Sequence, residues 1–153
     1  MSVARSARKT SSCQYVVTAG EVDSLISQLA IKLPKRWDAT RKSMLLETSD
    51  KLLSECVSAN AIWTTNQEEH RMRLCHLTEA YCACAVLQVR IDRIASERPT
   101  KRFDQTDENG ETVHIEQPCV SDGFLKVLCL TVDKEQSLIK GALRHEREKQ
   151  RLC

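Results

Sequence analysis

Apolar residues recur every three or four positions along four segments of the chain, the spacing at which side chains share one face of an α-helix. The segments end before Pro34, before Thr64, near Glu97 and near the C-terminus. The side chains expected to face inward are, in chain order, Val22, Leu25, Ile26, Leu29, Leu33, Leu45, Ser49, Leu52, Leu53, Cys56, Ala59, Leu74, Leu77, Tyr81, Cys84, Leu87, Ile91, Ala95, Leu125, Leu128, Cys129, Val132, Gln136, Ile139 and Leu143. Four such segments, joined by two short links and one long one, predict an all-α fold, an antiparallel up-and-down four-helix bundle.

Helix start signals set the expected boundaries. Residues 18–21 and 65–68 both fit a capping box, in which a side-chain oxygen and a carboxylate satisfy free amides. We therefore expect a basic flexible tail over residues 1–17, with an early start of the first helix at Tyr15–Val17 as the alternative. A third helix is expected to begin at Thr65. Asp38 is the expected N-cap of the second helix, and Ser121 or Asp122 that of the fourth.

Residues 99–120 break the helical periodicity and carry several acids together with Asn109, Gly110 and Pro118. Val113–Ile115 could pair as a brief strand, but we interpret the whole stretch as an acidic loop within a bundle domain that spans residues 18–148. The charged end, residues 144–151, is expected to fray into solvent, with residues 149–153 as a C-terminal tail.

Composition narrows the class of protein. Only 4% of residues are aromatic and only four are glycine, which argues against a β-sandwich or barrel. The eight cysteines show no repeating spacing, no apolar signal segment follows Met1, and no stretch is apolar enough to span a membrane. We therefore expect a cytoplasmic protein with reduced cysteines.

Basic residues gather around the link between the first two expected helices, although the net charge is only +2. Such a cluster would neutralise phosphates, and an aromatic ring within it would stack on a base. The alternative is a solvated surface with Trp37 folded onto the end of the bundle. Two arginines of the third helix are further candidates, although a solvated helix face would also account for them. The candidate nucleic-acid-binding residues are Lys32, Lys35, Arg36, Trp37, Arg41, Lys42, Arg90 and Arg93.

Several short motifs resemble a known family. They are Leu33–Trp37, Ala59–Ile62, Thr65–Glu69 followed by Arg71 and Arg73, Leu77–Ala80 and Leu138–Gly141. Their order is similar to that in the Avd-like four-helix bundle proteins, the accessory variability determinants of diversity-generating retroelements. These proteins are related to the bundles encoded within bacterial ribosomal-RNA intervening sequences. The resemblance covers roughly residues 22–98 and 121–148.

This resemblance implies a function and partners. It implies a non-catalytic homo-oligomer, commonly a pentamer, whose basic surface engages a reverse transcriptase and its RNA or DNA. The acidic stretch at 99–120, the many cysteines and the modest net charge depart from the family pattern.

Two other functional classes stay open. Arg71 and His76 fit an Arg-x4-His spacing that resembles the motif of HEPN ribonucleases, in which the imidazole would act as a general base on a ribose hydroxyl. An oligomeric scaffold without nucleic-acid contact is the third possibility. We expect no cofactor and no metal, because no C-x2-C pair or phosphate-binding loop is present, and Cys82 and Cys84 would lie about 200° apart on a helix.

Overall fold

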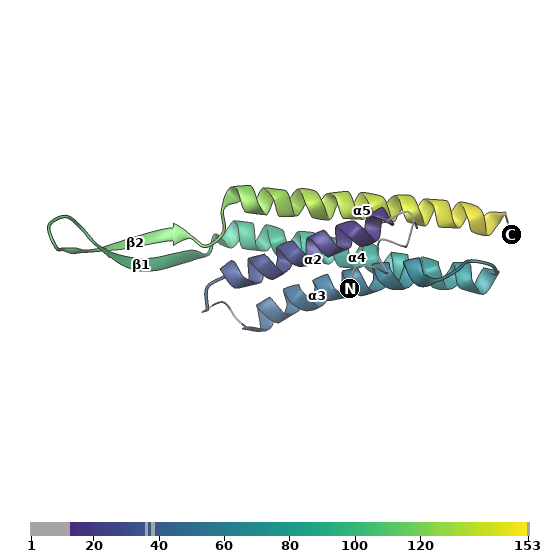
Figure 1. The fold of residues 1–153 in the computed structure, drawn as a ribbon, viewed down its shortest axis with the longest axis horizontal. Coiled ribbons are helices and arrows are strands. Elements are labelled where there is room, and N and C mark those ends of the chain that lie inside the picture. The colour runs from purple at the N-terminus through teal and green to yellow at the C-terminus, as the bar shows by residue number, and fades with distance from the viewer. Residues whose placement is uncertain (1–12, 36, 38, 153) are drawn as a thin grey trace, which may run out of the picture.

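The computed structural model describes residues 13–35, 37 and 39–152. Four helices and one two-stranded hairpin make up this part of the chain (Figure 1). The elements are α2 (Gln14–Lys32), α3 (Ala39–Ala61), α4 (Gln67–Glu97), β1 (Thr100–Thr106), β2 (Thr112–Pro118) and α5 (Asp122–Arg151).

The helices pack in a closed cycle, with contacts between α2 and α3, α3 and α4, α4 and α5, and α5 and α2. Consecutive helices run in opposite directions (Figure 1). The expected apolar faces meet in one core, and every residue expected to face inward is buried or partly buried except Ala95, which is exposed. At that point the core face of α4 continues through Ile94 instead, so the expectation for Ala95 was wrong.

Helix boundaries follow the expected signals in part. Pro34 does follow the end of α2, and Ser121 caps α5 by accepting from the Phe124 amide. The start of α2 at Thr18 was wrong, and the alternative of an early start at Tyr15 is close to the observed one. The helix begins at Gln14, and Thr18 is fully buried inside it. Asp38 lies outside the described residues.

The cap of α4 is displaced by one residue from the expected position. Asn66, rather than Thr65, is the N-cap, and its side chain accepts from the Glu69 amide at 2.9 Å. The Glu69 carboxylate reaches back to the Thr65 amide and hydroxyl, each at 2.6 Å. The reciprocal pairing expected of a capping box is therefore present in a shifted frame.

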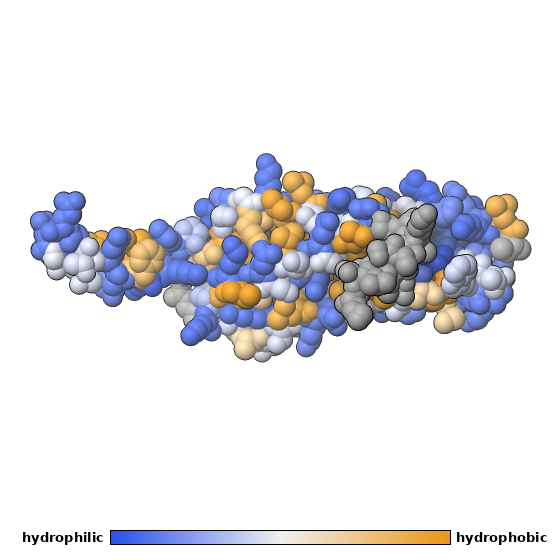
Figure 2. Space-filling model, in the orientation of Figure 1, coloured by the Kyte–Doolittle hydropathy of each residue, from blue (hydrophilic) through white to orange (hydrophobic). Residues whose placement is uncertain are grey.

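Residues 99–120 are not a loop, which corrects the sequence interpretation. β1 and β2 form an antiparallel ladder from Thr100 opposite Pro118 to Thr106 opposite Thr112. The Asp107 carboxylate accepts from the amides of Asn109 and Glu111, and Gly110 adopts a left-handed φ of 78° that closes the turn. The hairpin projects beyond one end of the bundle as an arm with a hydrophilic tip (Figures 1 and 2).

The C-terminal end also differs from the expectation, because α5 continues as a helix to Arg151 rather than fraying from residue 144. Glu146 is only 2% exposed and pairs with the buried His70 of α4. Arg73 of α4 bonds the other Glu146 oxygen at 3.3 Å and donates to the Ala59 and Ile62 carbonyls at the end of α3. This ionic cluster ties the last turns of α5 to α4 and α3. No helix in the described part of the chain is long and apolar enough to cross a membrane.

Candidate nucleic-acid interface

Four of the residues expected to bind nucleic acid line a single cleft between α3 and α4, near the hairpin end of the bundle. The cleft has a volume of about 230 Å³. Its walls are Trp37, Arg41, Met44, Leu45, Arg90, Arg93 and Ile94, and we call it the Trp37 cleft. The structure therefore brings the aromatic ring together with three arginines from two helices.

Two of the three arginines of the Trp37 cleft share one acidic partner. Arg41 and Arg93 both pair with Glu97, at 3.1 and 3.2 Å, and the Arg41 guanidinium lies 5.3 Å from the Trp37 ring centroid. Arg90 is different, because its Nη1 meets only the Met44 sulfur at 3.8 Å and its buried Nε has no hydrogen-bond partner among the described residues. Arg90 is thus the cleft cation with the fewest polar partners.

Three of the remaining expected residues do not join this cleft. Lys32 lies over the Phe124 ring of α5, with its Nζ 4.7 Å from the centroid. Lys42 donates to the Leu33 carbonyl at 3.2 Å, which ties α3 to the end of α2. Lys35 is exposed, and Arg36 lies outside the described residues. The single basic cluster expected from the sequence is therefore divided in the structure.

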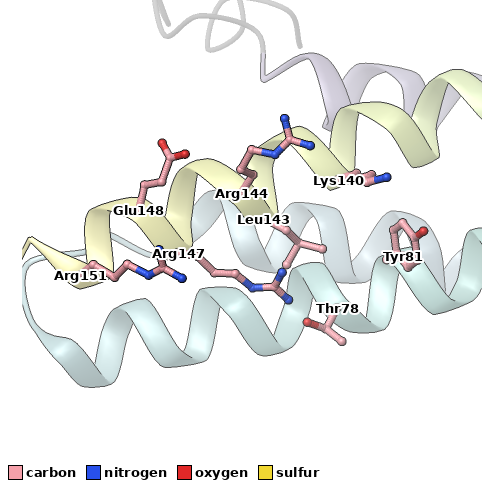
Figure 3. Close-up of a pocket in the computed structure, with 8 residues that line it drawn as sticks. All are labelled: Thr78, Tyr81, Lys140, Leu143, Arg144, Arg147, Glu148 and Arg151. Atoms are coloured by element: carbon pink, nitrogen blue, oxygen red, sulfur yellow. The ribbon is translucent and has the colours of Figure 1, made fainter.

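A larger basic hollow lies toward the opposite end, between α4 and the C-terminal half of α5. Its volume is about 500 Å³. Thr78, Tyr81, Lys140, Leu143, Arg144, Arg147, Glu148 and Arg151 line it, and we call it the α5 groove. Arg147 and Arg151 extend from α5 into the space between the two helices, whereas Arg144 and Glu148 point away from α4 (Figure 3).

The cations of the α5 groove follow the helical repeat. Lys140, Arg144, Arg147 and Arg151 are separated by four, three and four residues, so they form one stripe along α5. No ion pair joins any of them to an acid within the part of the chain that the structure describes. Sequence reasoning missed this stripe because the segment was expected to fray, although its spacing was visible in the sequence.

The ionic cluster described above holds the α5 groove in place. Glu146 lies between Arg144 and Arg147 in sequence but points to the opposite side, toward His70 and Arg73. The last turns of α5 are therefore anchored by a buried face while their basic face stays open to solvent. A preformed row of cations avoids the entropy of ordering a loose tail on binding.

The residues of the expected ribonuclease motif are not brought together. Arg71 and His76 are five positions apart in the sequence, which places them about 140° apart around the helix. The His76 Nδ1 lies 2.5 Å from a Glu55 oxygen, and Arg71 makes a 3.5 Å exposed pair with Glu68. Neither a hydrogen bond nor an ion pair connects Arg71 and His76 among the described residues.

One titratable group occupies the centre of the bundle. Glu135 of α5 is fully buried and accepts a 3.7 Å hydrogen bond from the Cys56 thiol, while its Oε2 has no partner in the described structure. Burial raises the pKa of the Glu135 carboxyl to about 8, and it also raises the pKa of the Cys56 thiol. Among the described residues, no three His, Cys, Asp or Glu side chains converge into a group that could hold a metal ion.

Comparison with known proteins finds no counterpart: no family model, no curated protein and no solved structure matches this chain. The geometry of the two basic regions and the family resemblance are therefore the grounds for a functional proposal. The α5 groove offers positive charge, while the Trp37 cleft offers an aromatic ring beside arginines.

Proposed function

We propose that this protein binds RNA or DNA through basic surfaces of a four-helix bundle and performs no catalysis itself. The α5 groove is the primary contact in this proposal. The observation that carries it is the row of four cations that form no ion pair with any acid among the described residues. Each cation that meets a phosphate releases counterions, which favours binding at low salt.

The contrast with the rest of the surface supports this choice. Arg41 and Arg93 pair with Glu97, Lys51 pairs with Glu79 at 2.8 Å, and Arg71 pairs with Glu68. A cation with an acid beside it presents less net positive charge to a phosphate than a cation without one. The Trp37 cleft is accordingly a secondary contact, in which Arg90 meets a phosphate and Trp37 stacks on a base.

The biological setting in this proposal is that of an accessory protein of a diversity-generating retroelement. The resemblance of the short motifs supports this setting, with a reverse transcriptase as protein partner and a homo-oligomer, commonly a pentamer, as the working form. The protein would organise the nucleic acid while the polymerase supplies the chemistry. Co-expression with the reverse transcriptase encoded nearest to this chain tests the pairing, and failure to co-purify counts against it.

A charge-removal experiment tests the α5 groove. Fluorescence anisotropy with a labelled single-stranded RNA measures the Kd of the wild type and of Arg144→Gln/Arg147→Gln. Loss of two phosphate contacts should weaken binding by at least about tenfold at low salt. The matched control is Lys126→Gln/Lys134→Gln, which removes two exposed cations from the same helix outside the groove and should leave the Kd within about twofold.

Other outcomes separate the competing functions. Absence of RNA and DNA binding by the wild type at low salt would favour an oligomeric scaffold without nucleic-acid contact. Cleavage of the RNA that is lost in His76→Ala would favour the ribonuclease. Equal weakening by the groove and control variants would mean that net charge, rather than the α5 groove, determines binding.

A further inference from the structure

Helix α4 has two opposite faces with the same heptad spacing. The inner face, which includes Leu77, Cys84 and Ile91, is buried in the core. A second row of side chains lies on the opposite face, offset by two residues from the inner one. Its members recur at alternating intervals of three and four residues. This outer row consists of Met72, Cys75, Glu79, Cys82, Val86 and Val89. Alternating three- and four-residue steps are the pattern of a helix that packs against another helix.

The outer row is exposed although most of it is apolar. Met72 is 46% exposed, Val86 41% and Val89 69%, and both Cys75 and Cys82 are exposed. A hollow of about 440 Å³ adjoins the row, and its lining includes Ala85, Val86 and Val89. Single exposed apolar residues are ordinary, but a continuous row along a helix marks an interaction surface.

We propose that the outer row of α4 is the docking surface for α4 of a second copy of this chain, in an antiparallel pair around a two-fold axis. A two-fold contact uses the same surface on both copies, so the row must be complementary to itself. The charged residues at the two ends of the row distinguish the possible registers of such a pair.

One antiparallel register pairs every position of the row with another position of the row. In this register, the residue numbers of two facing positions sum to 161, which gives three kinds of facing pair. Met72 faces Val89 of the second copy, Cys75 faces Val86, and Glu79 faces Cys82. Apolar side chains then meet in four of the six layers that symmetry generates, and the Glu79 layers lie near the two-fold axis, where Glu79 keeps its pairing with Lys51 of its own chain.

Charge complementarity supports this register. The next layer outward places Arg93 against Glu68 of the second copy. Beside the facing layers, at positions whose numbers sum to 163, Arg71 of one copy lies near Asp92 of the other. All four residues are exposed, and their pairs within the chain are short-range surface contacts of low energy. The contact would run from Glu68 to Arg93, a length of about 38 Å along the helix.

A parallel pair is disfavoured by the same residues. It would set Glu79 against Glu79 and Arg93 against Arg93, with like charges in facing layers. A shift of the antiparallel register by one heptad in one direction would place His76 beside Arg90. A shift by one heptad in the other direction would place Val86 opposite Glu68. The inference goes beyond the proposed function, because a two-fold contact closes with two copies and does not by itself form the pentamer that the resemblance implies. It is also independent of nucleic-acid binding.

The first test compares matched substitutions on two exposed surfaces. Sedimentation equilibrium without nucleic acid measures association of the wild type, of Val86→Asp/Val89→Asp, and of the control Val127→Asp/Leu130→Asp on α5. The control residues are 53% and 58% exposed, so both variants replace two exposed apolar residues with two acids. The α4 variant should raise the dissociation constant by at least about tenfold, whereas the control should leave it unchanged.

The second test addresses the register. Arg93→Glu should weaken association by placing two acids in contact, and adding Glu68→Arg in the same chain should restore it. In a Cys82→Ser background, Val86→Cys should form an intermolecular disulfide with Cys75 under oxidation, identified by mass spectrometry. The same background with Val127→Cys in place of Val86→Cys provides the control and should not form the corresponding cross-link.

Three results would overturn the inference. One is a wild type that stays monomeric, and another is association that is equally sensitive to the α4 and control variants. The third is failure of both the charge rescue and the cross-link between positions 75 and 86. Because no nucleic acid is present, loss of RNA binding alone would refute the proposed function and leave this inference standing.

Discussion

Two glutamates of α5 occupy core positions, and their surroundings differ. Glu146 is matched by His70 and Arg73, so its charge has partners on two sides. Glu135 has only the Cys56 thiol, and one of its oxygens is unpartnered in the described structure. We therefore expect that replacing Glu135 stabilises the protein, whereas removing a partner of Glu146 destabilises it.

Replacing Glu135 should reveal its cost to stability. Its folded-state pKa of about 8 lies above the ordinary value of 4.5. Between these values the unfolded chain has released the proton that the folded chain still holds, so stability should fall as pH rises through this window and then level off. Glu135→Gln should flatten this dependence and stabilise the protein near pH 8, by about 1.4 kcal/mol for each pKa unit removed.

Urea denaturation across this pH range measures the effect. Glu47→Gln, at an exposed position of α3, is the control and should follow the wild-type pH profile. A Glu135→Gln profile identical to that of the wild type would contradict the buried placement of the carboxyl.

Replacing the partly buried Arg73 should lower the stability of the protein strongly. Arg73→Met removes the donor to two carbonyls at the end of α3 and one partner of the buried Glu146, and should lower the free energy of unfolding by about 2–4 kcal/mol. Arg71→Met, two residues away, loses only an exposed pair and should change it by less than about 0.5 kcal/mol. Equal effects in thermal denaturation would mean that the ionic cluster does not stabilise the fold.

At the scale of elements, two glycines should respond oppositely to the same substitution. Gly141 lies within α5 with open space around its missing Cβ, so Gly141→Ala should stabilise the protein by about 0.5–1 kcal/mol. Gly110 closes the hairpin turn at a φ of 78°, where Ala is strained, so Gly110→Ala should weaken the hairpin. Thermal denaturation reports the first change, and amide exchange of β1 and β2 reports the second. A destabilised Gly141→Ala variant would contradict this account.

The helices were predictable because burial imposes a regular spacing on apolar residues. Leu52, Leu87 and Ile139, each in its expected row, are fully buried. The hairpin was not predictable in this way, since neither of its faces is covered by the bundle and no regular alternation results. Phe103, opposite Ile115, remains 42% exposed. The sequence marked it through the Asn109-Gly110 turn signal and through Val113–Ile115, which could pair as a brief strand.

The candidate site was predictable only in part. The sequence indicated Trp37, Arg41, Arg90 and Arg93, and the structure places them in one cleft. It also led us to expect a frayed end at α5, because charged residues near a terminus usually solvate. The end of α5 stays helical because Glu146 pairs with His70, which lies 76 positions away in the sequence. A local sequence pattern does not identify a partner at such a distance.

At the scale of the whole molecule, the two basic regions lie toward opposite ends of the bundle. The α5 groove adjoins the first half of α4, and the Trp37 cleft adjoins its last turns. An antiparallel pair of α4 helices would bring the α5 groove of one copy and the Trp37 cleft of the other to the same end. Each end of the pair would then offer both kinds of contact.

This arrangement predicts that RNA length matters. A long single strand that reaches both ends of the pair should bind more tightly than a short one, because the second contact becomes intramolecular. Val86→Asp/Val89→Asp should therefore weaken binding of a long RNA by about tenfold or more and leave a short oligonucleotide unaffected. Fluorescence anisotropy with RNAs of two lengths measures this, and an equal loss for both lengths would argue against bridging.

The hairpin has a consequence for engineering of the chain. The Cys119 amide donates to the Pro99 carbonyl at 2.9 Å, so the polypeptide leaves and re-enters the helices at neighbouring points. A segment with adjoining ends can be exchanged without moving the elements that flank it. The turn at Asp107–Glu111 is therefore the place to graft an epitope or a fluorescent label while the bundle keeps its shape.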